Sequence, residues 1–308
     1  MTIKASVSAN TEVDFNQQHQ QVTYSIAYGS RRVVDPQREL HTVVLQNRRW
    51  DNAVINLPPN IQNTLGVEAV LPVPTDIIAA QIKAVLSDIG ADAVKIGMLH
   101  SAEVVLAVRD SLLQAEEQGW IRPADGSGAC NIVLDPVMVA TSGHRLIEES
   151  AIRVLTEELL PLARVITPNI PEAEILAGIE IRSQQDLPAV ARALSAKASR
   201  RTPVSVLMKA GHLTDDRLVD IFYNAEEDRI VELPSERVTT PNTHGTGCTL
   251  SSAFASFLAQ GLPLDAAARA ATSYIHSAIV SGASYAIGHG HGPVDHFWRF
   301  TQLPDNQR

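Results

Sequence analysis

From about Thr75 onward, stretches with helical hydrophobic spacing alternate with short apolar runs. Apolar residues recur every three or four positions and predict helices over residues 75–89, 102–118, 151–160, 171–177 and 187–198. The runs between them predict strands over residues 93–99, 132–135, 165–167 and 204–209. Apolar strands separated by long helices pair in parallel with right-handed crossovers. The pattern therefore predicts an α/β fold with a central, mostly parallel sheet and helices on both faces.

The two ends of the chain depart from this alternation. Residues 218–223 and 229–233 flank a short polar turn and predict a hairpin added at the sheet edge. Residues 248–260 and 264–281 predict two helices rich in small side chains. Residues 1–62 show no sustained period of either kind, and five arginines between positions 31 and 49 make them locally basic. We find no internal repeat and no linker that divides the chain.

The composition is that of an ordinary globular protein and excludes several classes. Hydrophobic residues make up 45% of the 308 residues and charged residues 19%, and the net charge of −9 offers no basic field for nucleic acid. Cys130 and Cys248 form neither a disulfide framework nor a zinc motif. The polar N-terminus is unlike a signal peptide, and no run approaches the roughly 18 apolar residues of a membrane span. We expect a soluble cytoplasmic protein with no nucleic-acid or membrane partner.

Polar residues gather where the predicted strands end. In a parallel sheet, ligands bind beyond the carboxyl ends of the strands, where Asp135, Asn169, Lys209 and Gly211 fall. The Lys209 ammonium can neutralise phosphate there, or it can simply be a solvated lysine. Because a lysine at a strand end buries little surface, we expect Lys209→Ala to weaken phosphate binding with little effect on folding.

Oxygen ligands are available at the same edge. Hydrated Mg²⁺ takes one or two carboxylates beside phosphate oxygens, so Asp135, Asn169 and Glu172 can hold it. A purely structural interpretation also stands, because Asn169 and an early Glu172 cap a helix well. Likewise, Asp135 before Pro136 is typical of a turn.

The sharpest local signal is the sequence THGTGCT over residues 243–249, directly before a predicted helix. Gly245 and Gly247 let the backbone approach a ligand, and the free N–H groups of the helix start, from Thr246 on, favour an anion. Cys248 falls in the first turn, where the helix dipole lowers the pKa of a thiol, so that it can take a proton or hold developing charge. The alternatives are a plain glycine-rich turn and a small buried cysteine.

Other familiar motifs are weak or missing. The sequence GHGHG at residues 288–292 has two histidines without a cysteine or carboxylate cluster, which is more typical of a C-terminal loop than of a metal site. The chain lacks the P-loop, dinucleotide-binding and serine-hydrolase signatures. A phosphate-binding site in this chain is therefore expected to be neither a P-loop nor a dinucleotide-binding loop.

In order along the chain, these segments resemble the hydroxymethylpyrimidine/phosphomethylpyrimidine kinases of thiamine biosynthesis, which belong to the ribokinase-like superfamily. The resemblance covers residues 63–300. The matching pieces are QNTLGV (62–67), KIGML (95–99), LDPVM (134–138), SG (142–143), ITPNIPEA (166–173), LMKAGHL (207–213), THGTGCT (243–249) and GHGHGPVDHF (288–297).

This resemblance implies a ribokinase-like α/β fold and a kinase that uses ATP and Mg²⁺. The implied substrate is a small pyrimidine, 4-amino-5-hydroxymethyl-2-methylpyrimidine, whose monophosphate is then phosphorylated again. The family also implies a homodimer. In this family a cysteine, here Cys248, stands where the wider superfamily usually has an aspartate base.

The same resemblance assigns roles to individual residues. The pyrimidine would be contacted by Gln62, Gly97, Met98 and Val137. The nucleotide would be bound by Asp135, Asn169, Glu172, Lys209, Gly211 and Thr246, with Mg²⁺ at Asp135 and Glu172. The catalytic group would consist of Lys209 and an anion hole formed by Gly245, Thr246, Gly247 and Cys248.

The resemblance breaks at the N-terminus. Family members carry a strand and the sequence AGSDSGGGAGIQAD, which covers the substrate, whereas this chain has RRVVDP over residues 31–36 and no glycine between Gly29 and Gly66. We expect a mobile tail with a strand remnant near 24–27 in residues 1–28, an atypical segment over 29–62, the kinase domain over 63–300 and a tail over 301–308. Residues 29–61 are either translated out of frame, which sequencing the gene decides, or naturally divergent.

Two other functions compete with this one. A pyridoxal kinase has the same fold and shares the Gly-Thr-Gly-Cys sequence. A non-catalytic, nucleotide-binding relic or regulatory subunit belongs to a different class. Release of ADP in the presence of hydroxymethylpyrimidine, of pyridoxal and of neither acceptor distinguishes the three.

Overall fold

The computed structural model describes the chain in separate stretches. Side chains are described for residues 64–65, 73–122, 129–138, 147–213 and 217–299. The backbone alone is described for residues 2–4, 14–16, 21–22, 41–46, 52–57, 60–62, 67–70 and 300–301. The strand remnant expected near 24–27, the Ser142–Gly143 motif and much of the atypical segment lie outside the described residues.

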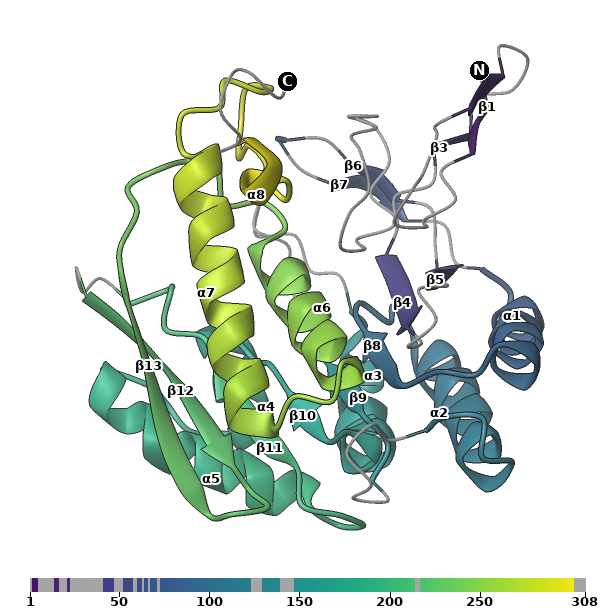
Figure 1. The fold of residues 1–308 in the computed structure, drawn as a ribbon. Helices are drawn as coiled ribbons and strands as arrows, with labels where there is room; N and C mark the ends of the chain where they lie inside the picture. Colours follow the sequence, from purple (N-terminus) through teal and green to yellow (C-terminus); the bar gives the residue numbers. More distant parts are fainter. Residues whose placement is uncertain are drawn as a thin grey trace.

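An eight-stranded sheet forms the centre of the described structure (Figure 1), in the order β13-β12-β11-β10-β9-β8-β4-β5. Strands β8, β9, β10 and β11 pair in parallel, and all strands except β4 and β12 share one direction. The sheet is therefore mostly parallel, as the hydrophobic pattern predicts. The strand bounds are β4 His41–Gln46, β5 Asn52–Leu57, β8 Ala93–Ile96, β9 Ile132–Leu134, β10 Val165–Ile166, β11 Ser205–Met208, β12 Arg217–Asn224 and β13 Arg229–Glu236.

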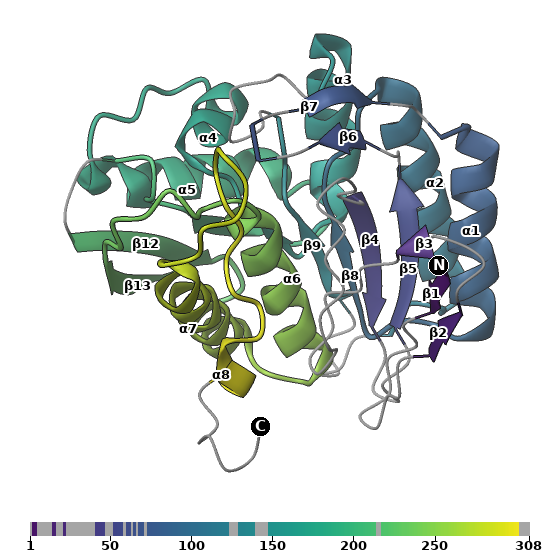
Figure 2. The same ribbon diagram turned by 90° about the horizontal axis from the view of Figure 1, so that it is seen from above.

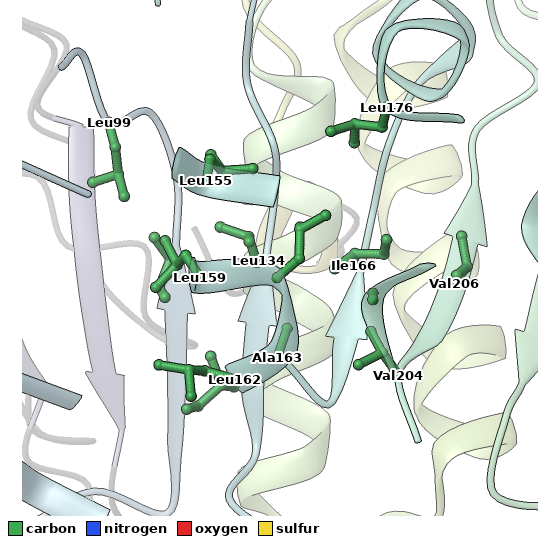
Figure 3. Packing of buried hydrophobic residues seen from close by; sticks show 14 of the residues in the cluster. Leu99, Leu134, Leu155, Leu159, Leu162, Ala163, Ile166, Leu176, Val204 and Val206 are labelled. Atoms are coloured by element: carbon green, nitrogen blue, oxygen red, sulfur yellow. The ribbon is translucent and has the colours of Figure 1, made fainter. Parts of the chain in front are cut away.

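Alternate residues of the buried strands face two different sets of helices. Ile132 and Leu134 of β9 pack with α1, α2, α4 and α5, whereas Val133 between them packs with α6 and α7. Figure 2 shows these two sets on opposite sides of the sheet, and Figure 3 shows Leu134 and Ile166 within the first cluster. The helix bounds are α1 Thr75–Asp88, α2 Ala102–Glu117, α3 Glu149–Val154, α4 Ile170–Ala177, α5 Leu187–Ala198, α6 Thr246–Ala259, α7 Leu264–Gly282 and α8 Trp298–Thr301.

Local signals in the sequence set the helix ends. Ser101 caps α2 by accepting a hydrogen bond from the N–H of Val104 at 3.4 Å. The helix predicted over 151–160 is different, because α3 ends at Val154 and continues as a π-helical turn and then a 3₁₀ turn. Pro161 lies in that last turn, and a proline cannot donate the backbone hydrogen bond that a continuing α-helix needs.

The N-terminal strands depart most from the expected order. No period in residues 1–62 predicts a strand, yet β4 pairs with β8 and β5 pairs with β4, both antiparallel. Pairing satisfies the backbone groups along the free edge of β8, and such long-range contacts override weak local patterns. Two smaller sheets are formed by β1 Thr2–Lys4, β2 Asp14–Asn16 and β3 Gln21–Val22, and by β6 Asn60–Gln62 and β7 Val67–Val70.

The opposite edge of the sheet agrees with the sequence. Strands β12 and β13 form the predicted hairpin, which pairs antiparallel with β11. Helices α6 and α7 then cover one face of the sheet, and their small side chains allow them to pack closely against each other. Of the helices described, none has the length and apolarity needed to cross a membrane.

Candidate active site

Three polar residues lie at one edge of the sheet, where the central strands end. Asp135 follows β9, Thr167 follows β10 and Lys209 follows β11, and the register of these parallel strands brings them together. The strand residues two positions earlier, Val133 and Val165 among them, pack against α6 and α7. Because side chains alternate along a strand, the three polar groups point toward the same helices.

Asp135 is the centre of this row and is 1% exposed. Its Oδ1 accepts hydrogen bonds from Thr167 Oγ1 and Lys209 Nζ, both at 3.1 Å, and its Oδ2 accepts one from Ser251 Oγ at 3.4 Å. Burial raises the pKa of this carboxyl, but the ammonium groups of Lys209 and Lys95 lower it more, so the pKa lies below its ordinary value. Asp135 is therefore a buried carboxylate that stays ionised.

Lys209 is buried between two carboxylates. Its side chain is 15% exposed, and its Nζ lies 3.1 Å from Asp135 Oδ1 and 3.9 Å from Glu172 Oε2. Burial lowers the pKa of the ammonium, but the charges of Asp135 and Glu172 raise it above the ordinary value. The expectation that this strand-end lysine buries little surface is wrong, because the start of α6 covers it. Replacing Lys209 must therefore affect folding as well as ligand binding.

The start of α6 lies directly against this ammonium. The helix begins at Thr246, and its N-cap, Gly245, has a φ of +81°, a conformation that favours glycine. A Cβ atom on Gly247 would lie 3.2 Å from Lys209 Nζ. Cys248 follows in the first turn and interacts electrostatically with Lys209. The THGTGCT motif and Lys209, which are distant in sequence, thus meet in one site.

Asn169 and Glu172 cap helix α4 reciprocally. Asn169 Oδ1 accepts a hydrogen bond from the N–H of Glu172 at 2.9 Å, and Glu172 Oε2 accepts one from the N–H of Asn169 at 2.8 Å. Burial raises the pKa of Glu172 to about 7, although the nearby Lys209 lowers it. The capping interpretation of the two residues is therefore correct. The cap also holds the Glu172 carboxylate beside Lys209.

Asp220 of β12 belongs to the site although the sequence analysis does not select it. Its Oδ1 accepts a hydrogen bond from the N–H of Ala210 at 2.7 Å, which fixes the turn that carries Lys209 and Gly211. Burial raises the pKa of Asp220 to about 6, while the Ala210 N–H and Lys209 lower it. The one signal in the sequence is an aspartate within an otherwise apolar part of a strand.

We expect Asp220 to make the protein less stable as the pH rises. Its pKa of about 6 in the fold exceeds the ordinary 3.8, so the folded state binds more protons than the unfolded state between these values. The free energy of unfolding should carry a component that falls from about pH 4 to about pH 6. Asp220→Asn, which keeps the acceptor for Ala210, should remove that component in urea denaturation curves. A parent-to-variant difference that does not change with pH would contradict this assignment.

Two of the four residues expected to contact a pyrimidine lie on the β8 side of the row. Gly97 and Met98 directly follow β8, and Met98 is 1% exposed. Val137 lies two residues beyond Asp135, on the segment that follows β9. Gln62 ends β6, and its side chain lies outside the described residues.

The GHGHG loop holds the segment that follows Gln62. The N–H of His291 donates to the carbonyl oxygen of Thr64 at 2.9 Å, and the N–H groups of His289 and Gly290 donate to Thr64 Oγ1 at 3.2 and 3.3 Å. A Cβ atom on Gly290 would collide with the Thr64 carbonyl group, so the approach requires glycine. Backbone contacts thus account for this glycine-rich motif.

The carboxylates of the site suit Mg²⁺ bound together with a nucleotide. Among the residues that the structure describes, no three His, Cys, Asp or Glu side chains are grouped so that they could hold a metal by themselves. A nucleotide-bound Mg²⁺ needs only one or two carboxylates, because phosphates and waters supply its other oxygens. Asp135 and Glu172, which lie 3.1 and 3.9 Å from the same Lys209 nitrogen, meet that requirement.

Comparison with known proteins identifies the family. The family model for phosphomethylpyrimidine kinase matches residues 53–295, well over half of the chain. The chain belongs to the phosphomethylpyrimidine kinase family. The match leaves out residues 1–52, which include most of the segment where the resemblance breaks.

Individual proteins agree with this family. The chain is 43% identical over 240 residues to the hydroxymethylpyrimidine/phosphomethylpyrimidine kinase of Rhizobium meliloti (strain 1021), covering 78% of this chain and 83% of that protein. It resembles the crystal structure of phosphomethylpyrimidine kinase from Clostridium difficile 630 with a TM-score of 0.59 and 36% identity, over 73% of this chain and 85% of that one. It also resembles an ADP complex of Bacillus subtilis pyridoxal kinase with a TM-score of 0.64 and 28% identity, over 84% of each chain. These neighbours confirm the ribokinase-like fold expected from the sequence.

Proposed function

We propose that this chain transfers the γ-phosphoryl group of ATP to hydroxymethylpyrimidine and then to the resulting monophosphate, in thiamine biosynthesis. Members of the phosphomethylpyrimidine kinase family are phosphotransferases, and so is this chain. The observation that carries the proposal is the contact between the start of α6 and the Lys209 ammonium, at the edge of the sheet where ligands of such folds bind. It provides a helix N-terminus and a cation for the same phosphate group.

Phosphoryl transfer depends mainly on positioning and on neutralisation of charge. In the proposed mechanism, the backbone N–H groups of Gly245, Thr246, Gly247 and Cys248 bind the charge that develops on the transferred group. Lys209 binds phosphate oxygens of ATP, and Asn169, Gly211 and Thr246 complete the nucleotide site. Asp135 and Glu172 would hold Mg²⁺, which would supply further neutralisation of phosphate charge.

An assay of the purified chain with three acceptor conditions tests this function. We expect release of ADP with hydroxymethylpyrimidine, less with pyridoxal, and only background release without an acceptor. Pyridoxal is included as an acceptor because the chain is similar in structure to Bacillus subtilis pyridoxal kinase. Faster turnover of pyridoxal would replace the proposal with that function. Nucleotide binding without turnover of either acceptor would indicate a non-catalytic relic.

Cys248 provides a second test, because we propose that its thiol takes the proton of the attacking hydroxyl. We expect Cys248→Ser to lower kcat for hydroxymethylpyrimidine by about 100-fold, the low end for a general base, since the N–H groups of the helix start remain. The rise of kcat with pH in the parent should be absent from the variant. A variant profile that is uniformly lower but has the same shape would leave Cys248 as part of the anion hole only.

We further propose a cytoplasmic homodimer. The family resemblance supports the dimer, and the use of ATP supports the compartment. The two cysteines, Cys130 and Cys248, are not joined in a disulfide, which suits a reducing environment. For residues 29–61 we propose either a frameshift or a natural divergence in which the stretch makes a different lid or a subunit contact, and the family match that begins at residue 53 is compatible with both.

A further inference from the structure

Lys95 is a second buried lysine at the site, and the mechanism above does not use it. It is the third residue of β8, where its neighbours Val94 and Ile96 pack with the helices of the far face. Its side chain therefore points toward α6, the same side as Asp135. A Cβ atom on Gly97 would lie 2.7 Å from Lys95 Nζ, so the ammonium reaches forward to the edge of the sheet. Burial raises the pKa of Asp135, and there the Lys95 ammonium lowers it electrostatically, together with Lys209, which has the larger effect.

Lys95 is buried and interacts with Asp135 through charge alone. The residue is 4% exposed, yet its Nζ makes neither a hydrogen bond nor an ion pair with any described residue. The nearest carboxylate group of the row, Asp135, is already paired with Lys209 at 3.1 Å. Among the described residues the Lys95 charge thus has no hydrogen-bonded counter-ion of its own, and an anionic ligand bound at this edge of the sheet would supply one.

The two lysines divide the site into two sides. Lys209 follows β11 and faces the residues proposed to bind ATP, whereas Lys95 lies beside Gly97 and Met98, which are proposed to bind the acceptor. A neutral hydroxymethyl acceptor needs no cation on that side. A phosphorylated acceptor carries close to two negative charges near pH 7 and must approach the charged phosphates of ATP. Only the second acceptor therefore requires a positive charge there.

We propose that Lys95 binds the phosphate group of the monophosphate acceptor and thereby makes the second phosphorylation possible. This inference rests on the proposed function. In the second step, an oxygen of the acceptor phosphate attacks the γ-phosphorus of ATP. The bond from that phosphorus to the oxygen that bridges it to the β-phosphate breaks, and ADP leaves with the bond's electron pair. The attacking oxygen is already ionised, so no proton has to be removed, and the Lys95 ammonium offsets the repulsion between the two anions.

The test compares both half-reactions in Lys95→Met, which keeps the length of the side chain and removes its charge. With the monophosphate as acceptor, we expect kcat/KM to fall by about 30-fold or more, the usual cost of removing one partner of a desolvated charge pair. With hydroxymethylpyrimidine as acceptor, we expect a change of less than about threefold. Lys197→Met is the matched control, because Lys197 Nζ donates to the carbonyl oxygen of Leu176 on α4, and it should alter neither reaction.

The outcomes distinguish failure of the Lys95 inference from failure of the proposed function on which it rests. If the parent phosphorylates neither acceptor, the proposed function fails. If the parent phosphorylates both and Lys95→Met loses both equally, Lys95 has only a structural role and the inference is overturned. Should Lys95→Met and Lys95→Gln both fail to fold, thermal unfolding of the parent without nucleotide still decides. The monophosphate should then raise Tm more than an equal concentration of hydroxymethylpyrimidine, and equal shifts would reject the inference.

Discussion

Replacing Lys209 with methionine is expected to lower kcat with hydroxymethylpyrimidine by about 10³-fold, the effect typical of losing a cation or hydrogen-bond donor that stabilises a transferring group. The ammonium lies against the start of α6 and pairs with Asp135, and it is the cation proposed to bind the phosphate oxygens of ATP. Steady-state kinetics of ADP release measure the effect. Turnover within about tenfold of the parent would show that Lys209 does not bind the transferred phosphate.

The same substitution should also destabilise the fold, in contrast to the expectation from sequence. Lys209→Met leaves Asp135 as a buried carboxylate without its ion-pair partner, a change that typically costs about 3 kcal/mol. The double variant Asp135→Asn/Lys209→Met separates the two effects, since it removes the orphaned charge together with the ammonium. We expect it to recover stability in thermal unfolding but not to recover the rate. Recovery of both would mean that Lys209 acts only by balancing Asp135.

Asn242→Ala is expected to lower the free energy of unfolding by about 3 kcal/mol and Tm by roughly 6–10 °C. Asn242 is 2% exposed, and its side-chain amide donates to the carbonyl oxygens of Gly282 at 2.9 Å and Tyr285 at 2.8 Å. These bonds join the residues just before the THGTGCT motif to the end of α7. Removing the amide leaves buried carbonyl groups unsatisfied and frees the loop that leads into α6, so KM for ATP should rise as well.

Thr240→Ala is the matched control for Asn242→Ala. Thr240 Oγ1 donates to the carbonyl oxygen of Ala283 at 3.0 Å and accepts from the backbone N–H of Asn242 at 3.1 Å. This variant therefore removes two hydrogen bonds from the same cluster but leaves the Asn242 side-chain amide with its own partners. We expect a loss of about 1–2 kcal/mol, smaller than that of Asn242→Ala, and an unchanged KM for ATP. If the two variants behave alike, Asn242 is not the residue that anchors the loop.

The sequence predicts the parts of this molecule in which local pattern and tertiary packing agree. The apolar runs around Val133 and Val165 are buried on both faces, so they identify their strands whatever their neighbours are. The capping pair Asn169 and Glu172 is likewise visible, because a helix N-terminus needs such residues wherever it occurs. The meeting of Lys209 with the start of α6 follows once the strands are known to be parallel, since their carboxyl ends share one edge.

The remaining features depend on contacts that no local pattern contains. Strand β4 takes its place because β8 offers it an unpaired edge, and neither strand alone indicates an antiparallel pairing. Lys95 and Asp220 each lie in a stretch that reads as an ordinary strand. Lys95 belongs to the site because its charge lowers the pKa of Asp135. Asp220 belongs to it because its carboxylate accepts a hydrogen bond from the N–H of Ala210. Only the assembled fold shows that they belong to the site.

The lysines of this site are enclosed in a protein whose net charge is −9. Within about a Debye length of the surface, ~10 Å at 0.1 M salt, an approaching nucleotide meets the protein's net negative charge before it reaches the two enclosed ammonium groups. Electrostatic steering therefore works against the encounter, and moderate ionic strength should speed the capture of ATP rather than slow it. Selection among anions takes place only after a molecule has reached the two lysines, where shape and desolvation decide.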